Sequence, residues 1–136
     1  MTGEFCFMLT TYGLVLLKVP VSDIARSAAF YGGGLGLEEV FYAPEYSWAQ
    51  YQTGDLGIAL YVPGKSGGES PLGRDLDFHL QTDDLEGLVE RLKSGGIDVG
   101  EGIGRGDDNW DCLNVRDPDG NLLKIFGPQP EHDGAG

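Results

Sequence analysis

The sequence predicts an α+β fold built from two copies of one unit, in which a strand and a helix precede three further strands. The glycine-rich stretch 64–73 divides the chain, and both parts show this βαβββ order of hydrophobic patterns. With 136 residues, 40% of them hydrophobic, the chain is long enough for one core. We therefore predict a single domain over 1–136, with modules at about 13–63 and 74–127 joined by the linker 64–73.

In each half, alternation of apolar and polar residues predicts strands, and a helical period predicts one helix. The elements expected in the first half are strands at Leu14–Val21, Leu37–Tyr42, Ser47–Gln52 and Gly57–Val62 and a helix at Asp23–Tyr31. Those expected in the second half are strands at Leu76–Gln81, Ile97–Val99, Asp111–Arg116 and Asn121–Phe126 and a helix at Asp83–Lys93. Gly95-Gly96 is typical of a helix end, and Asp117-Pro118-Asp119-Gly120 predicts a turn between the last two strands.

The composition excludes several classes of partner. The net charge of −13 repels phosphate, so we expect neither nucleic acid nor an anionic membrane as a partner. No apolar stretch approaches the roughly 20 residues of a membrane span. The first residues, Met1–Tyr12, lack the positive start of a secretory signal, which favours the cytoplasm. Cys6 and Cys112 form no Cys-x-x-Cys pattern, so we expect neither a disulfide framework nor a zinc site.

The acidic residues concentrate in the second half, which holds 16 of the 22. Five of them gather around Trp110, namely Asp107, Asp108, Asp111, Asp117 and Asp119. An aromatic ring flanked by carboxylates suits a flat or cationic ligand, through stacking and cation–π attraction. We therefore expect these acids to draw a cationic ligand to the site, although acidity that serves only solubility is the alternative.

Several short motifs carry a resemblance to a known family. They are Val21-Ser22-Asp23 with Ser27 and Phe30-Tyr31, then Leu35-Gly36-Leu37, and Asp117-Pro118-Asp119-Gly120-Asn121. Together with the repeated βαβββ order, they resemble the vicinal oxygen chelate superfamily, which includes glyoxalase I, extradiol dioxygenases and bleomycin-resistance proteins. The resemblance covers about Leu14 to Phe126. It implies two curled sheets around a ligand-binding funnel, with metal ligands on the first and last strands of each module in the metal-dependent members.

Aligned on this family, the chain lacks the expected metal ligands. The four positions fall on Leu16 and Ala59 in the first module and on Asp77 and Lys124 in the second. Leucine and alanine donate no electrons to a metal, and lysine repels a cation. Asp77 remains, with His79 two residues further on and facing the same way. A catalytic metal usually has three protein ligands, so we predict no metal and no cofactor.

Strand alternation, read with the resemblance, predicts which side chains face the funnel. The candidate ligand-binding residues are Leu16, Lys18, Trp48, Gln50, Ala59, Tyr61, Asp77, His79, Trp110, Cys112, Asn114, Lys124 and Phe126. Aromatic planes with a few polar groups are typical of a pocket for a drug-sized organic molecule. These candidate residues also have purely structural interpretations. The tryptophans can be packed residues, His79 can be a structural histidine, and Lys124 can be a partner of Asp77.

These observations favour a metal-independent binding protein of the bleomycin-resistance type, which sequesters an aromatic or cationic organic compound and has no catalytic residue. The stretch from Trp110 to Asn121 resembles the corresponding one in bleomycin-resistance proteins, which bind a basic planar antibiotic without destroying it. The alternatives are a glyoxalase- or dioxygenase-like enzyme using Asp77 and His79, and a metal-free acid–base isomerase. The resemblance also implies a homodimer, and leaves open whether the modules pair within one chain or between two.

Overall fold

The computed structural model describes residues 12–65, 67–106 and 109–130. In the first half the elements are β1 (Leu16–Pro20), α1 (Ile24–Ala28), the π-helical turn η2 (Ala29–Gly34), β2 (Glu38–Ala43), η3 (Pro44–Tyr46), β3 (Trp48–Thr53) and β4 (Leu56–Tyr61). In the second half they are β5 (Asp75–Gln81), α2 (Leu85–Ser94), β6 (Ile103–Arg105), β7 (Trp110–Arg116) and β8 (Leu122–Pro128). The βαβββ order therefore occurs twice, as predicted.

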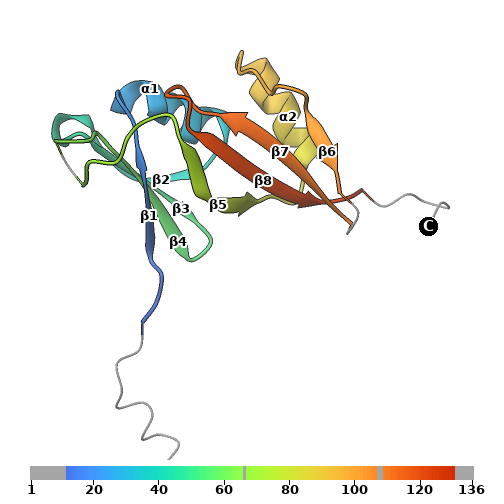
Figure 1. Ribbon diagram of the computed structural model, residues 1–136, viewed down its shortest axis with the longest axis horizontal. Helices are drawn as coiled ribbons and strands as arrows, with labels where there is room; N and C mark the ends of the chain where they lie inside the picture. The colour runs from blue at the N-terminus through green and yellow to red at the C-terminus, as the bar shows by residue number, and fades with distance from the viewer. Residues whose placement is uncertain (1–11, 66, 107–108, 131–136) are drawn as a thin grey trace, which may run out of the picture.

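Each half forms its own four-stranded mixed sheet, so the predicted α+β class is confirmed. The strand orders are β1-β4-β3-β2 and β5-β8-β7-β6. In both sheets the first strand lies parallel to the last, and the remaining neighbours are antiparallel. Figure 1 shows the two sheets side by side, with α1 and α2 on the same side of the molecule. The sheets do not close into a barrel.

Both helices begin at an aspartate that caps the helix N-terminus. The Asp23 carboxylate accepts a hydrogen bond from the Arg26 N–H, and that of Asp84 accepts one from the Gly87 N–H. The second helix ends as predicted, because Gly96 adopts a positive φ of 78° that a residue with a side chain rarely takes. Within the described residues, no helix is long and apolar enough to cross a lipid bilayer.

One predicted strand is wrong. The alternating segment Ile97–Val99 forms no strand, and the edge strand of the second sheet is β6, a few residues later. Val99 is 7% exposed and Ile97 packs against the core, so their apolar character serves packing from a loop rather than a place in the sheet. The Gly102 N–H donates to the Val99 carbonyl and turns the chain there.

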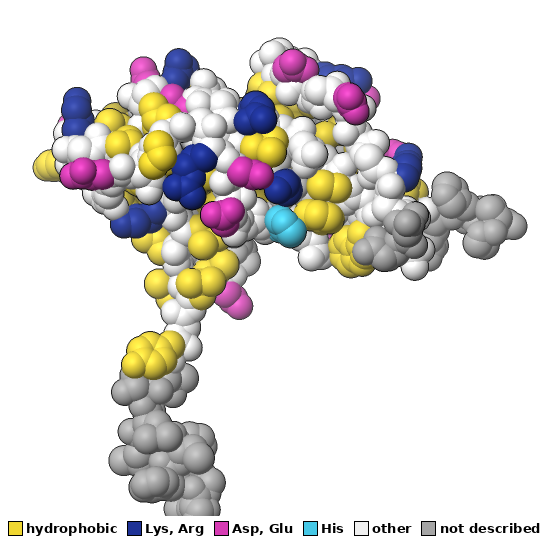
Figure 2. Space-filling model, in the orientation of Figure 1, with side chains coloured by type: hydrophobic (Ala, Val, Ile, Leu, Met, Phe, Trp, Pro, Cys, Tyr) yellow, Lys and Arg dark blue, Asp and Glu magenta, His cyan; other side chains and the backbone are white. Residues whose placement is uncertain are grey.

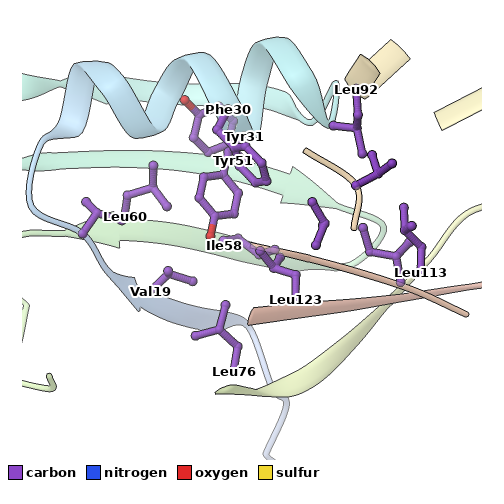
Figure 3. Packing of buried hydrophobic residues seen from close by; sticks show 14 of the residues in the cluster. Val19, Phe30, Tyr31, Tyr51, Ile58, Leu60, Leu76, Leu92, Leu113 and Leu123 are labelled. Carbon is purple, nitrogen blue, oxygen red and sulfur yellow. The ribbon is translucent and has the colours of Figure 1, made fainter. Parts of the chain in front are cut away.

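A single cluster of buried side chains joins the two halves (Figure 3). The first half contributes Val19, Tyr31 and Tyr51 among others, and the second half contributes Leu92 and Leu113. Modules of the same chain therefore share a core. Burial of this apolar surface is the main source of cohesion between the halves.

Polar contacts add to this core where the β7–β8 turn meets the first half. The Tyr31 hydroxyl donates to Asp117 Oδ2 at 2.6 Å, and the amide of Asn121 donates to the Pro20 carbonyl at 2.8 Å. Asp119 accepts hydrogen bonds from the Ser22 N–H and from the Arg26 guanidinium, at 2.9 and 3.0 Å. We call this set of contacts the polar junction.

Candidate functional site

Each sheet has one face packed on the core and an opposite face, here called the open face. In the first sheet, Lys18, Ala59 and Gln50 are cross-strand neighbours on the open face. In the second sheet, Phe126 is paired with both Gln81 and Cys112. The thirteen candidate residues all occupy open-face positions of the strands, but they form two groups, six on the first sheet and seven on the second.

The linker partly covers the group on the first sheet. Gly67 lies so close that a Cβ on it would approach the Trp48 ring and the Tyr61 Cβ at 3.0 Å. The Lys18 ammonium donates to the Gly67 carbonyl and lies 5.7 Å from the centre of the Tyr61 ring. Tyr61 is only 3% exposed, and Ala59 is fully buried. This group therefore holds the linker against the sheet, and Lys18 and Gln50 are its more accessible polar members.

Part of the group on the second sheet lines a large cavity of about 1000 Å³. Four predicted residues contribute to its wall, namely Trp110, Cys112, Asn114 and Phe126. Asp98 and the segment 100–106, which includes the neighbouring edge strand β6, also line it, together with Arg116 and Leu122. We call this space the aromatic cavity.

Sequence reasoning missed two cationic residues of this cavity, Arg105 and Arg116. Arg105 lies in β6, which the sequence pattern placed elsewhere. Arg116 follows the same alternation as Cys112 and Asn114, so that pattern, extended by one step, would have found it. Its guanidinium donates to the Gly120 carbonyl at 2.8 Å, which fixes its position at the end of β7.

Cys112 is a half-buried thiol in the wall of the aromatic cavity. Its Sγ donates a weak hydrogen bond to Asn114 Oδ1 at 3.6 Å. Burial raises the pKa of the Cys112 thiol, against an opposing effect of the Lys124 charge and a backbone hydrogen bond at Ile125. Because the thiolate is the reactive form, a raised pKa makes Cys112 a slow nucleophile at neutral pH.

The polar residues of β5 and β8 pair differently from the sequence-based interpretation. Lys124 pairs with Asp75, at 3.2 Å, and not with Asp77. Asp77 instead lies 3.5 Å from the guanidinium of Arg74. His79 packs its ring against Phe126, with ring centres 4.6 Å apart. The exposed Asp77 and His79 thus share a face, but among the described residues neither belongs to a group of three or more potential metal ligands.

The expected acidic cluster around Trp110 does not form among the described residues. Asp111 lies on the core side of β7, 2% exposed, where it pairs with Arg105 and accepts from the Gln129 amide at 3.0 Å. Asp117 and Asp119 belong to the polar junction, and Asp107 and Asp108 lie outside the described residues. On the face shown in Figure 2, acidic and basic side chains are interspersed. The acids close in sequence are thus divided between the core side and the junction.

The four positions aligned with metal ligands hold Leu16, Ala59, Asp77 and Lys124 on the open faces. Within the described part of the chain, no three His, Cys, Asp or Glu side chains come close enough together to hold a metal ion. Leu16 and Ala59 offer no donor atom, and Lys124 carries a positive charge. The residues present therefore do not fit the metal site of metal-dependent relatives.

Two paired βαβββ modules with an open-faced sheet in each define a class of small ligand-binding folds and enzymes. Residues 13–125 match the family model of the Glyoxalase/Bleomycin resistance protein/Dioxygenase superfamily, and the chain belongs to this superfamily. No curated protein matches the sequence.

Solved structures of several bacterial proteins share the fold. TnmS3, an antibiotic binding protein from Streptomyces sp. CB03234, is 22% identical and aligns over 89% of this chain and 99% of its own, with a TM-score of 0.70. TioX from Micromonospora sp. ML1 is 15% identical over 86% and 99%, with a TM-score of 0.71. A lactoylglutathione lyase from Agrobacterium tumefaciens is 21% identical over 87% and 95%, with a TM-score of 0.68. At these identities the likeness extends to the fold alone.

Proposed function

We propose that the protein binds a small aromatic organic molecule in the aromatic cavity, without a metal and without converting it. The observation that carries this proposal is the cavity itself, in which Trp110 and Phe126 face a space of about 1000 Å³. Ligand pockets for drug-sized molecules reach this size and combine aromatic walls with a few polar groups, here those of Asn114 and Arg116.

Two further observations support a binding role. The side chains at the four metal-ligand positions cannot provide the three ligands of a catalytic site, as described above. TnmS3 is described as an antibiotic binding protein, so the same fold serves antibiotic binding elsewhere. In the cell, such binding would sequester an antibiotic and thereby confer resistance to it.

The charge of the cavity changes the expected ligand. Its wall carries Asp98, Glu101 and Arg116, while the charge of Arg105 is paired with Asp111, so the local charge is mixed and selects a cation only weakly. A cationic ligand would still gain from the Trp110 ring, by about 0.5–2 kcal/mol. Planarity is therefore the main feature we expect of the ligand, and positive charge is secondary.

The experiment uses Cys112 as a reporter of occupancy. In the full-length Cys6→Ser variant, N-ethylmaleimide modifies Cys112 slowly, and a ligand in the cavity should slow this reaction at least about tenfold. A panel of basic and neutral planar aromatic compounds is screened in this way, with tryptophan fluorescence as a second signal. Recovery of each compound unchanged after incubation tests the absence of turnover.

Variants then locate the binding site. Trp110→Ala and Phe126→Ala should weaken binding about tenfold or more, because each removes an aromatic wall. Tyr46→Ala, at an exposed position of η3 outside the cavity, is the matched control and should bind normally. If no compound of the panel protects Cys112, or if protection is the same in Trp110→Ala, the proposal is wrong.

A second candidate function is a glyoxalase- or dioxygenase-like activity, favoured by the lyase among the structural neighbours and by Asp77 and His79 on one face. It requires a divalent metal. Metal analysis of the purified protein after incubation with Mn²⁺, Ni²⁺, Zn²⁺ or Fe²⁺ distinguishes it, since stoichiometric metal that Asp77→Ala abolishes would favour the enzyme. Metal-free isomerisation with His79 as base is the remaining alternative, and His79→Ala would abolish it.

We also propose a cytoplasmic homodimer. The open face of the first sheet ends at the edge strand β2, where Phe41 is 52% exposed beside Gln50. A second copy that covered this face would bury apolar surface that the single chain leaves in water.

A further inference from the structure

A second cavity, of about 370 Å³, lies between the two halves, and neither Trp110 nor Phe126 is among its wall residues. The first half contributes Leu35, Leu37 and the β3–β4 turn at Thr53 and Gly54 to its wall. The second half contributes Leu88 of α2 and residues 79–82 at the end of β5. We call it the inter-module cavity.

Comparison of the two modules shows which contact in one module is equivalent in position to this cavity in the other. Val21 N–H donates to the Tyr61 carbonyl, and Thr82 N–H donates to the Phe126 carbonyl in the same way. Asp23 and Asp84 cap the two helices, so residues at equal distances from them correspond. On this basis Ser27 corresponds to Leu88, and Tyr31 corresponds to Leu92.

In the polar junction, the turn of the second half packs against the helix of the first. Asp117 and Asn121 of that turn are buried, and they bond to Tyr31 and Pro20. The corresponding turn of the first half is closed by the pair Thr53 and Leu56, and its side-chain hydrogen bonds among the described residues stay within the turn and do not reach α2. One junction is thus filled and polar, while the other is left open.

Two features make the open junction suitable for a ligand. Leu35, Leu37 and Leu88 are only partly buried and pack against the core, so an apolar surface remains available. A Cβ built on Gly54 would meet no atom within 4 Å, so the turn leaves room beside the cavity. Thr53, Thr82 and His79 supply polar groups at the wall.

We propose that the inter-module cavity is a second binding site, for a small, neutral and mostly apolar molecule of one or two rings. A dry cavity of about 150 Å³ is enough for benzene, so this space accommodates a bicyclic compound. The leucines supply the apolar contact, and a single N–H or O–H of the ligand has Thr53 or Thr82 as a partner. The site is separate from the proposed function and does not depend on it.

The test uses indole as the probe and the full chain as the protein. Titration followed by ¹H–¹⁵N NMR should shift the amide signals of Leu37, Gly54 and Leu88 in a saturable manner, with a dissociation constant of about 0.1–1 mM for so small a ligand. Leu88→Trp fills the cavity from α2 and should weaken this binding at least about tenfold. Glu90→Trp, an exposed position on the same helix, is the control and should leave it unchanged.

A second variant protects the test against misfolding. Thr53→Phe fills the same cavity from the opposite wall, so both filled variants should lose the shifts while their remaining spectra stay folded. Trp110→Ala separates the two sites, since it should remove only indole shifts at Cys112 and Asn114. The proposal is overturned if indole shifts only these aromatic-cavity signals, if it shifts none, or if the filled, folded variants bind indole as the natural sequence does.

Discussion

Two buried tyrosines, Tyr31 and Tyr51, differ in whether the hydroxyl group has a hydrogen-bond partner. The Tyr31 hydroxyl donates to Asp117 across the polar junction, at 2.6 Å. Among the described residues, the Tyr51 hydroxyl is the one buried side-chain oxygen or nitrogen without a hydrogen-bond partner. A buried polar group without a partner is destabilising, whereas one bonded to a carboxylate contributes to stability.

We therefore expect opposite results from removing the two hydroxyls. Tyr31→Phe should lower the free energy of unfolding by about 1–3 kcal/mol, because it removes one of the two hydrogen bonds that the buried Asp117 Oδ2 accepts, the other coming from Asn121. Tyr51→Phe should be neutral or stabilise by up to about 1 kcal/mol, because it removes an unpaired polar atom. Urea unfolding of both variants checks this, and equal losses in the two would contradict it.

Alkaline pH provides a second measurement on the same pair. Burial, with the nearby Asp117 carboxylate, raises the pKa of Tyr31 well above its ordinary value of 10.0. Burial, with the Glu39 charge, raises the pKa of Tyr51 to about 12. Because the pKa of each hydroxyl is higher in the folded than in the unfolded chain, this difference contributes to stability fully below pH 10. The contribution is lost as the pH rises through the folded-state pKa. Each Phe variant should lose less stability above pH 10 than the natural sequence does.

The predicted strand faces agree with the structure where a local rule applies, whereas ligand contact by these residues stays a prediction. Strand alternation places Cys112, Asn114 and Phe126 on one face, and the structure gathers them in one cavity. The predicted acidic cluster did not form among the described residues, because side chains that are close in sequence can point in different directions. Asp111 follows Trp110 directly and therefore points to the other face of β7.

At the scale of elements, the β7–β8 turn is an organising element of the fold. Asn121 is fully buried, and its Oδ1 accepts from the Gly73 and Arg74 N–H groups at 2.9 and 3.3 Å. Its Nδ2 donates to the Pro20 carbonyl and to Asp117. One side chain thus connects the linker, the first strand and its own turn.

We predict that Asn121→Ala destabilises the protein by about 2–4 kcal/mol, since it leaves several buried donors and acceptors unpaired. Hydrogen exchange should show faster exchange at Gly73 and Arg74 first, while the central strands β4 and β8 remain protected. Asp55→Ala, in the exposed turn of the first half, is the control and should change stability by less than about 0.5 kcal/mol. Uniform loss of protection throughout the chain would contradict this role.

Prediction of the elements was reliable where the pattern and the ending signals agreed. Gly95-Gly96 marks the end of the second helix correctly. The segment Ile97–Val99 misled because two apolar residues that enter the core from a loop have the same spacing as a strand. The π-helical turn η2 extends the first helix beyond Tyr31, and its three glycines gave no signal for that geometry.

At the scale of the whole molecule, the sequence predicts the two modules but not their arrangement. The repeated pattern contains no information on distances between modules, which depend on core packing and on the polar junction. The candidate residues therefore divide into two groups on separate sheets rather than lining one funnel. A second copy of the chain that brings open faces together would restore the predicted funnel, which connects the binding proposal to the oligomeric state.

This assembly leads to a prediction on the edge strand β2. Phe41 pairs with Gln50 on the open face, while Tyr42 pairs with Ala49 and faces the other way. Phe41→Asp should therefore dissociate the dimer, whereas Tyr42→Asp adds the same charge at a similarly exposed neighbour and should leave it intact. Light scattering measures the mass, with 14.6 kDa for one chain and about twice that for the dimer. A natural sequence that remains at the mass of one chain at high micromolar concentration would exclude the dimer, and dissociation by both variants alike would place the interface elsewhere.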